Sequence, residues 1–296
     1  MFLVTGCSTS GVPLDLAPKH SAFITGHFAR PEITESSGIA ASRTQPGVYW
    51  TLNDSGGAPM VYAFDINGRD LGAWQLEGAE NTDWEALDIG PCTEAQSSDC
   101  FYIGETGDNA EQRNRVSIYR APEPWLGERE PGSIETIEAQ RIDFSYEDGP
   151  HDVEGIYVLP SGGLGLISKG RTGKAQLFVL DELETHSQPL VARSSMVLFD
   201  SVDEATGSRV TGASLSADGR ALAVLSYANL FIFRADPRTG LPLDQPPPTR
   251  CPLRPLALRQ GEAVTWYPLD NGFAQVVTSE GPAGQIALLT CPRPSE

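Results

Sequence analysis

The sequence predicts an all-β protein, a five-bladed β-propeller built from four-stranded antiparallel blades. One observation is a short phrase that recurs at intervals of about 50 to 70 residues. Each copy has an oxygen-bearing side chain, then a small residue, then usually a branched apolar residue. The copies begin at Ser37, Glu85, Glu154, Thr211 and Glu262. The other observation is that each copy starts a series of short apolar segments separated by turns, which is typical of a propeller blade.

Length and composition agree with this fold class. A chain of 296 residues suits one all-β domain, and 40% hydrophobic residues are enough to form a core. The 30 glycines and 23 prolines fit many tight turns. No segment has the 3.6-residue apolar period of a long helix. We therefore expect one propeller domain over residues 22–296, preceded by a polar tether within 1–21.

The first unit shows the pattern most clearly. We expect four strands in it, at 38–42, 48–52, 60–64 and 71–76. Turn sequences rich in Asn, Asp and Gly separate them, because these residues tolerate positive φ.

The later units repeat the pattern with turns of similar composition. Their expected strands are 85–89, 101–104, 116–119 and 142–144; 155–159, 165–168, 176–180 and 195–199; 212–216, 221–226, 230–233 and 256–258; and 263–267, 273–278 and 285–290. Segment 125–137 is expected to be a long acidic excursion between the third and fourth strands of the second unit. The fifth unit ends one strand short, so segment 22–28 is expected to supply its outermost strand and close the ring.

The net charge limits the possible partners. Acidic residues outnumber basic ones, 39 to 21, giving a formal charge of -18. This argues against nucleic acid or an anionic membrane surface as partner, since both bind basic patches. Acidity is compatible with cation binding, and it also fits solubility alone.

The cysteines point to export. Cys7, in the phrase Leu-Val-Thr-Gly-Cys, resembles the lipobox of bacterial lipoproteins, although only six residues precede it. The resemblance implies a lipid anchor on Cys7 and a start site further upstream; the alternative is a chance Gly-Cys pair. The remaining four cysteines pair by position, Cys92 with Cys100 and Cys251 with Cys291. An even set in an export context predicts disulfides and a place in the bacterial cell envelope, with membrane contact only through the lipid.

The repeated phrase also predicts a metal site. In an antiparallel meander the first strand of each unit begins on the face where the second strand ends. That face should gather carboxylates that include Asp54, Asp83 and Asp152 besides the three glutamates of the phrase. Carboxylates in a narrow channel repel unless a cation lies among them, and Ca²⁺ accepts about 6–8 oxygen ligands. We therefore expect Ca²⁺ at Ser37, Glu85, Glu154, Thr211 and Glu262, with Ser214 as the rival of Thr211.

A different interpretation of the same five residues remains open. They can be strand-start residues that hydrogen-bond to neighbouring blades, with the carboxylates sharing protons and water. Few histidines and no cysteines lie near them, so zinc and copper are not expected.

These residues resemble a known family. The five-bladed calcium-activated nucleotidases, or apyrases, hold a central Ca²⁺ with a Ser, Glu, Glu, Ser, Glu ring, and Ser37-Gly38-Ile39 and Asp83-Trp84-Glu85 are similar to its first two motifs. The resemblance implies a central calcium site and nucleotidase chemistry, but no nucleotide-contacting residue of the family is matched here. The chain also resembles uncharacterised bacterial secreted propellers, in Asn53–Gly57 and in Gly107-Asp108-Asn109 with Arg113.

Further candidates lie on the same rim. Asn53, Asn109, Arg113, Lys169 and Arg171 are candidates for ligand binding, the two last for a phosphate. Asp54, Glu105 and Asp108 are candidates for positioning water, and His151 for a general base. The alternatives are a structured turn for Asp108, Asn109 and Arg113, a solvated turn for Lys169 and Arg171, and a structural role for His151. Neither a Gly-x-Ser-x-Gly nor a His-Glu-x-x-His motif occurs, so serine hydrolase and zinc protease mechanisms have no support.

Two functions follow as expectations. The first is a monomeric, calcium-stabilised envelope scaffold whose rim binds a small molecule or a protein. The second is a Ca²⁺-dependent phosphoanhydride or phosphoester hydrolase.

Overall fold

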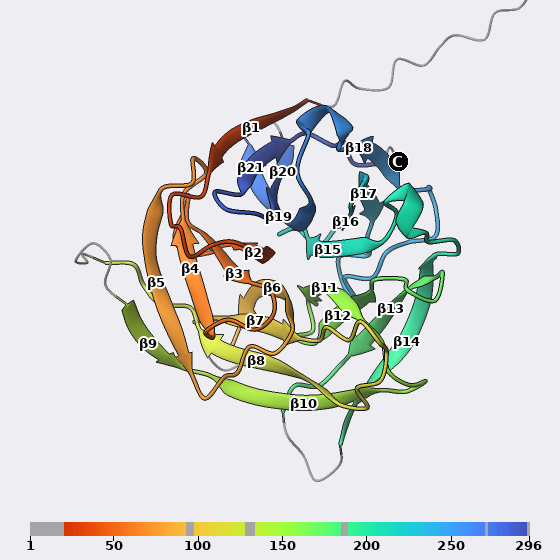
Figure 1. Ribbon diagram of the computed structural model, residues 1–296. Coiled ribbons are helices and arrows are strands. Elements are labelled where there is room, and N and C mark those ends of the chain that lie inside the picture. The colour runs from red at the N-terminus through yellow and green to blue at the C-terminus, as the bar shows by residue number, and fades with distance from the viewer. Residues whose placement is uncertain (1–20, 93–97, 128–133, 185–188, 270–271, 295–296) are drawn as a thin grey trace, which may run out of the picture.

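A computed structural model describes residues 21–92, 98–127, 134–184, 189–269 and 272–294. Almost all regular structure in these ranges is strand (Figure 1). The helical elements found there are two 3-10 helices, η1 (Glu204–Thr206) and η2 (Arg254–Leu256). Cys7 and the predicted tether lie outside the described residues.

The strands follow the predicted segments closely. Their bounds are β1 (Ala22–His27), β2 (Ser36–Ala41), β3 (Tyr49–Asn53), β4 (Met60–Phe64), β5 (Asp70–Glu77), β6 (Trp84–Pro91), β7 (Asp99–Glu105), β8 (Val116–Pro122), β9 (Ile134–Glu138), β10 (Gln140–Tyr146), β11 (Val153–Val158), β12 (Leu164–Ser168), β13 (Ala175–Leu180), β14 (Leu190–Phe199), β15 (Val210–Leu215), β16 (Ala221–Ser226), β17 (Asn229–Arg234), β18 (Thr249–Pro252), β19 (Gly261–Leu269), β20 (Gly272–Ser279) and β21 (Gln285–Leu289).

The strands are arranged around a central axis. Strands β2, β6, β11, β15 and β19, called the inner strands below, contact one another in that order, and β19 contacts β2 again. Figure 1 looks roughly along this axis, with the other strands of each sheet further out. The architecture is a β-propeller, and all five copies of the repeated phrase lie on the inner strands.

The hydrogen-bonded sheets depart from separate four-stranded units. The strand orders are β1-β21-β20-β19, β15-β16-β17-β18, β2-β3-β4-β5-β9 and β11-β12-β13-β14-β10-β8-β7-β6. The eight-stranded sheet consists of two antiparallel meanders joined where Phe144–Tyr146 of β10 pairs in parallel with Leu190–Ala192 of β14. Each of these meanders has the four strands that were predicted, but the prediction of separate blades is wrong here, because the two meanders share one sheet.

Two outer strands differ from expectation. The predicted excursion 125–137 ends in β9, which pairs in parallel with β5 and packs Ile137 onto a core cluster. The prediction that residues 256–258 form the outer strand of the fourth unit is wrong. The strand is β18, and Leu256 instead ends η2 as a buried residue, because Pro255 has no N–H for a sheet.

The N-terminal strand closes the ring as predicted. Strand β1 pairs antiparallel with β21 and forms the outer strand of the sheet that contains β19. Nearby, the Ser36 hydroxyl lies 2.8 Å from Thr51 Oγ1 and 2.9 Å from Thr278 Oγ1, so a buried hydroxyl network joins the first and last sheets.

The core fills the spaces between neighbouring sheets. Trp50 packs edge-on against Trp74 and Phe101, with ring centroids 4.8 and 4.9 Å away. All three rings are fully buried. Phe101 belongs to a different sheet from the tryptophans, so this contact joins two sheets through apolar burial.

Both predicted disulfides are present. Cys92 is bonded to Cys100, and Cys251 of β18 is bonded to Cys291, just after β21. Disulfides persist in oxidising compartments, so they indicate an extracellular or periplasmic environment. No helix in the described ranges is long and apolar enough to cross a membrane.

Candidate metal centre

A β-bulge positions the first residue of every copy of the repeated phrase. Each of these residues is the second residue of an inner strand, where the pairing with the next strand shifts by one residue. The five shifts fall at Ser37, Glu85, Glu154, Thr211 and Glu262. A bulge leaves one residue unpaired and redirects its side chain. The phrase thus marks a recurring local geometry, and all five bulged residues are at least 95% buried.

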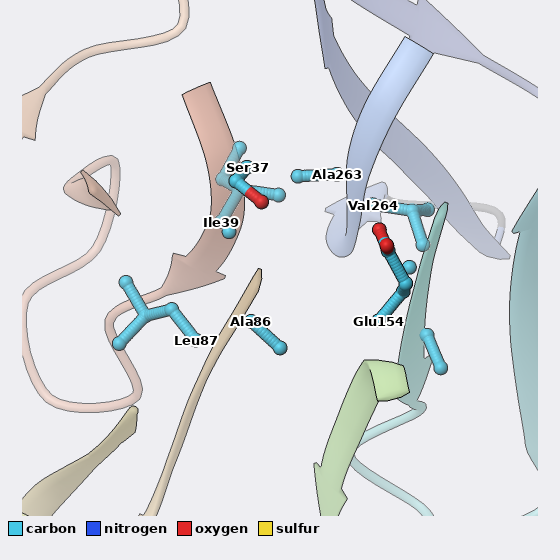
Figure 2. A pocket seen from close by; sticks show the side chains of 10 residues that line it. Ser37, Ile39, Ala86, Leu87, Glu154, Ala263 and Val264 are labelled. Atoms are coloured by element: carbon cyan, nitrogen blue, oxygen red, sulfur yellow. The ribbon is translucent and has the colours of Figure 1, made fainter. Parts of the chain in front are cut away.

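The small second residue of the phrase follows from close packing of the inner strands. A Cβ on Gly38 would lie 2.6 Å from the Leu87 backbone nitrogen, and one on Gly212 would lie 3.0 Å from the Glu262 carbonyl oxygen. Figure 2 shows this part of the axis, where Ser37, Glu154 and the apolar side chains of Ile39, Leu87 and Val264 line one small cavity. This cavity, lined by residues of all five inner strands, measures about 10 Å³, which is room for roughly one water molecule.

The carboxylates at the rim form two groups that share Glu85. The first consists of Asp54, Asp83 and Glu85, and the second of Glu85, Asp152 and Glu154. Within each group, one oxygen from every residue lies within 4.8 Å of the others. Asp54 follows β3, whereas Asp83 and Asp152 precede β6 and β11.

One carboxylate oxygen of the first group is unsatisfied. Asp54 Oδ1 is buried and has no hydrogen-bond partner. In the described part of the chain, no Lys, Arg or His lies within 4.0 Å of the carboxylates of Asp54, Asp83 or Glu85. Gly107 leaves the space beside two of them open, since a Cβ there would lie 2.4 Å from Asp83 Oδ2 and 2.6 Å from Glu85 Oε1.

The pKa values of this group reflect burial and mutual repulsion. Burial and the nearby Asp83 raise the pKa of Asp54 to about 6. Burial, with Asp152 and Glu105, raises the pKa of Asp83, although Arg113 and Lys169 oppose the shift. Burial and Glu154 raise the pKa of Glu85 well above its usual range. Ionising three neighbouring carboxyl groups at once is costly because their charges repel. A bound cation would offset this repulsion.

The second group already contains basic side chains. Lys169 Nζ is ion-paired with Glu154 Oε1, and Arg171 Nε with Asp152 Oδ2. Burial raises the pKa of Glu154 to about 7, although the Lys169 ammonium opposes this shift. Lys169 and Arg171, predicted as ligand-binding residues, thus contact carboxylates of the inner strands.

The other predicted ligands have local partners. The Ser37 hydroxyl donates to the Glu85 backbone oxygen (3.1 Å), and the Thr211 hydroxyl donates to the Gly261 oxygen (2.9 Å). Each therefore bonds to the neighbouring inner strand or its start. The amide of Gln260 donates to the Glu262 carboxylate, which lies outside both carboxylate groups. Ser214 accepts a hydrogen bond from Trp266 Nε1 through its backbone oxygen, at 2.9 Å.

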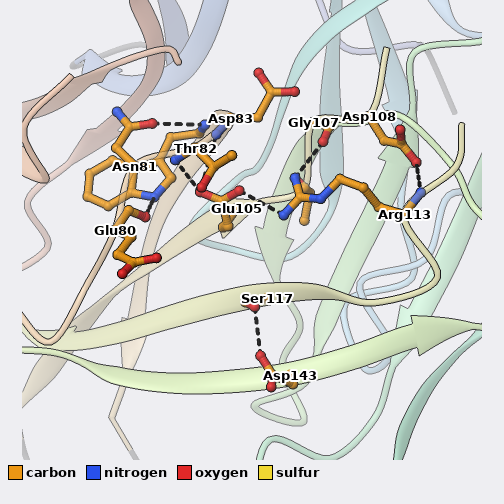
Figure 3. Close-up of polar contacts among 12 residues, drawn as sticks. Glu80, Asn81, Thr82, Asp83, Glu105, Gly107, Asp108, Arg113, Ser117 and Asp143 are labelled. Atoms are coloured by element: carbon orange, nitrogen blue, oxygen red, sulfur yellow. Dashed lines mark hydrogen bonds and ion pairs between the residues drawn. The ribbon is translucent and has the colours of Figure 1, made fainter. Parts of the chain in front are cut away.

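Several rim candidates hold the loop after β7 (Figure 3). Arg113 donates to Glu105 Oε1 at 2.9 Å and to the Gly107 oxygen at 2.6 Å. Asp108 Oδ2 accepts from the Arg113 backbone N–H at 2.6 Å, and Glu105 Oε2 accepts from the backbone N–H of Thr82 at 2.9 Å. The carboxylates of Glu105 and Asp108 thus fix the loop that carries Gly107.

Three other candidates have structural contacts. Asn53 accepts from two backbone N–H groups through Oδ1 and donates to the Glu32 oxygen. Asn109 Oδ1 accepts from Arg171. His151 pairs with Asp148 at 2.8 Å and packs against Phe178, with the ring centroids 4.6 Å apart.

The sequence reasoning missed three features of this centre. It did not identify the bulges, the space beside Gly107, or the contact of Lys169 with Glu154. A signal for the last was present, since Lys169 directly follows a predicted second strand and thus lies on the carboxylate rim.

Comparison with known proteins supports the fold. The chain matches no protein-family model and no curated protein sequence. The PQQ-bound aldose sugar dehydrogenase of Streptomyces coelicolor is 9% identical with a TM-score of 0.51, over 93% of this chain and 99% of that chain. A virginiamycin B lyase from Staphylococcus aureus is 10% identical with a TM-score of 0.41, over 93% and 100%.

A third structure is itself described as a β-propeller domain. This is Cps50 (Swd1) of Myceliophteria thermophila, 10% identical with a TM-score of 0.39, over 87% of this chain and 84% of that one. At such identities a similarity concerns the fold alone. The closed cycle of contacts among the inner strands, rather than these similarities, identifies the chain as a β-propeller protein with a carboxylate centre where the inner strands begin.

Proposed function

We propose that this protein is an exported five-bladed β-propeller that binds Ca²⁺ through Asp54, Asp83 and Glu85 and recognises a ligand at the surrounding rim. The closed cycle of contacts among the inner strands supports the count of five blades, with the eight-stranded sheet supplying two of them. Residues 22–296 would then form one monomeric domain, which a mass measurement in solution would test.

The observation that carries the calcium proposal is the unpartnered Asp54 Oδ1 in a group of three carboxylates without an ion-paired base. Ca²⁺ prefers hard oxygen ligands and tolerates irregular geometry. Three carboxylates provide part of the usual 6–8 ligands, so backbone oxygens, water or a bound ligand would complete the coordination. Glu154 and Glu262, expected as ligands from the sequence, lie outside this group, whereas Glu85 belongs to it.

Calorimetric titration with Ca²⁺ tests the site directly. Asp54→Asn and Asp83→Asn should each weaken binding by at least about 10-fold, which corresponds to about 1.4 kcal/mol. Asp200→Asn, at an exposed carboxylate, is the matched control and should leave affinity unchanged. Equal affinity in all four proteins would exclude this site.

Ligand recognition without turnover is the favoured role, because Glu105, Asp108 and His151 have structural partners. The second candidate is a Ca²⁺-dependent phosphoanhydride or phosphoester hydrolase. It is favoured by the partial exposure of Asp54 and Asp83, which would let a substrate reach the cation. Phosphate release from nucleoside di- and triphosphates with Ca²⁺, abolished by chelator and by Asp83→Asn, would establish the hydrolase. No release would favour the scaffold.

Lipidation of Cys7 is proposed on the lipobox resemblance and on the disulfides, which fit an exported protein. Expression of the complete gene in a bacterial host tests it. The protein should partition into detergent, and Cys7→Ser should move it to the aqueous phase. An aqueous wild-type protein would exclude the anchor.

A further inference from the structure

Three buried glutamates converge near the axis from different inner strands. Glu85, Glu154 and Glu262 are 4%, 2% and 5% exposed. Burial and the nearby Glu154 raise the pKa of Glu85 and of Glu262, so Glu154 acts electrostatically on both of the others. Such an arrangement is stable only when protons or a cation offset the repulsion.

The side chain of Lys169 extends toward these glutamates from a backbone that two hydrogen bonds hold in place. Lys169 follows β12, its N–H donates to the Asp152 oxygen at 2.8 Å, and its oxygen accepts from the Val210 N–H at 3.1 Å. Its side chain is 11% exposed, with Nζ on the Glu154 carboxylate and 6.0 Å from the centre of the Tyr227 ring. The ammonium also acts electrostatically on Glu85 and Glu262.

We propose that Lys169 supplies the axial cation of this propeller. Its ammonium pairs with Glu154 and supplies, next to Glu85 and Asp152, the positive charge that a metal ion would otherwise bring to this group. Those three residues form a latent divalent-cation site that opens when Lys169 is removed. Lys169 therefore determines where calcium binds and how many ions the protein holds. The number of calcium ions expected in the wild-type protein rests on the proposed function. The opening of a new site when Lys169 is replaced does not.

The contrast between the two carboxylate groups supports this inference. They share Glu85 and have similar spacing, yet only the second contains ion-paired bases. A lysine has one charge on a flexible stem, whereas Ca²⁺ has two charges and collects more oxygens. Removing Lys169 should therefore leave Glu154 and Glu85 without a counter-charge, while Arg171 stays paired with Asp152, and Ca²⁺ should take the place of the ammonium.

The first experiment counts ions by calorimetry and elemental analysis after gel filtration in Ca²⁺. Wild type should hold one Ca²⁺ per chain, and Lys169→Met should hold one more. Lys174→Met, at an exposed lysine of the same turn, is the matched control and should behave like wild type. Adding Glu154→Gln to Lys169→Met should remove the extra ion. An unchanged count in Lys169→Met would overturn the proposal.

The two proposals fail in different ways. If wild type holds no ion and Lys169→Met holds one, the calcium function is wrong but the role of Lys169 stands. If Lys169→Met does not fold, the wild-type background still gives a test. Glu154→Gln should then keep wild-type Ca²⁺ affinity within about 3-fold, while Asp83→Asn loses at least about 10-fold. A similar loss in Glu154→Gln would mean that the metal lies on the axis, and would overturn the proposal.

Discussion

The Ser37 hydroxyl oxygen lies 3.1 Å from the backbone oxygen of Glu85 and 3.2 Å from its Oε2. Both residues occupy the bulge position of their inner strands, so this contact joins β2 to β6 at the edge of the carboxylate centre. The repeated phrase was interpreted either as a set of metal ligands or as residues that hydrogen-bond to the neighbouring blade, and this contact fits both. Ser37 bonds to the neighbouring strand, while Glu85 belongs to both carboxylate groups.

Calcium bound as proposed should stabilise the fold, because Asp54 follows a strand of one sheet whereas Asp83 and Glu85 belong to the start of another. At 100 times the dissociation constant, a ligand of the native state adds about 2.7 kcal/mol, and 1 kcal/mol raises Tm by roughly 2–4 °C in a chain of this size. Differential scanning calorimetry with Ca²⁺ or with EDTA measures this. Glu85→Gln should lose most of the increase, and a full increase in that variant would argue against the site.

Gly107→Ala should impair calcium binding without changing the fold. The added methyl group would lie within 2.6 Å of Asp83 Oδ2 and Glu85 Oε1, so one carboxylate must move. We expect at least about 10-fold weaker Ca²⁺ binding by calorimetric titration. Gly57→Ala, where nothing lies within 4 Å of the new atom, is the control on the same rim. Equal affinities in both variants would contradict the assignment.

Gly38→Ala should destabilise the ring. The new Cβ would lie 2.6 Å from the Leu87 backbone nitrogen, where neither strand can move freely, and overpacking of this kind costs about 1–3 kcal/mol. Gly261→Ala lies on another inner strand but meets its nearest neighbour at 3.5 Å, so it should cost less. Urea denaturation compares the two, and equal midpoints would refute the close-packing argument.

The two disulfides should contribute unequally to stability. Cys251 and Cys291 are 40 residues apart, whereas Cys92 and Cys100 are 8 apart. From loop closure alone the stabilisation is about 4 and about 2.5 kcal/mol. Paired Cys→Ser replacements should therefore lower the denaturation midpoint more for Cys251 and Cys291. The reverse order would show that loop closure does not dominate.

Asp88→Asn should stabilise the protein above pH 6 and have little effect near pH 4. Burial raises the pKa of Asp88 to about 6, although the Val158 N–H donates to its Oδ2 at 2.7 Å. Its unfolded pKa is about 3.9, so its protonated form favours the folded state, and stability is lost as pH rises through 6. Asparagine keeps an acceptor oxygen and stays neutral. Its gain, about 1–3 kcal/mol at pH 8, should be absent at pH 4 in thermal melts. A pH-independent gain would disprove this assignment.

The sequence determined most of the strands and their order. Alternating apolar segments and Asn, Asp and Gly turns depend on nearby residues, so strands such as β4 and β16 were predicted with their observed ends. The cysteine positions also sufficed for both disulfides. The recurring phrase placed five residues on inner strands, because the small residue after each is required wherever two inner strands meet.

Tertiary structure alone decided the sheet edges and the distribution of charge in the centre. Strand β9 pairs with β5, and β10 with β14, through parallel contacts between segments far apart in the chain, which leave no local pattern. Whether Glu154 meets a metal or an ammonium depends on where Lys169 Nζ lies, since electrostatic energy depends on distances between atoms rather than on positions in the chain. The sequence thus determined that carboxylates gather at one rim, and the packing of the strands determined which of them Lys169 neutralises.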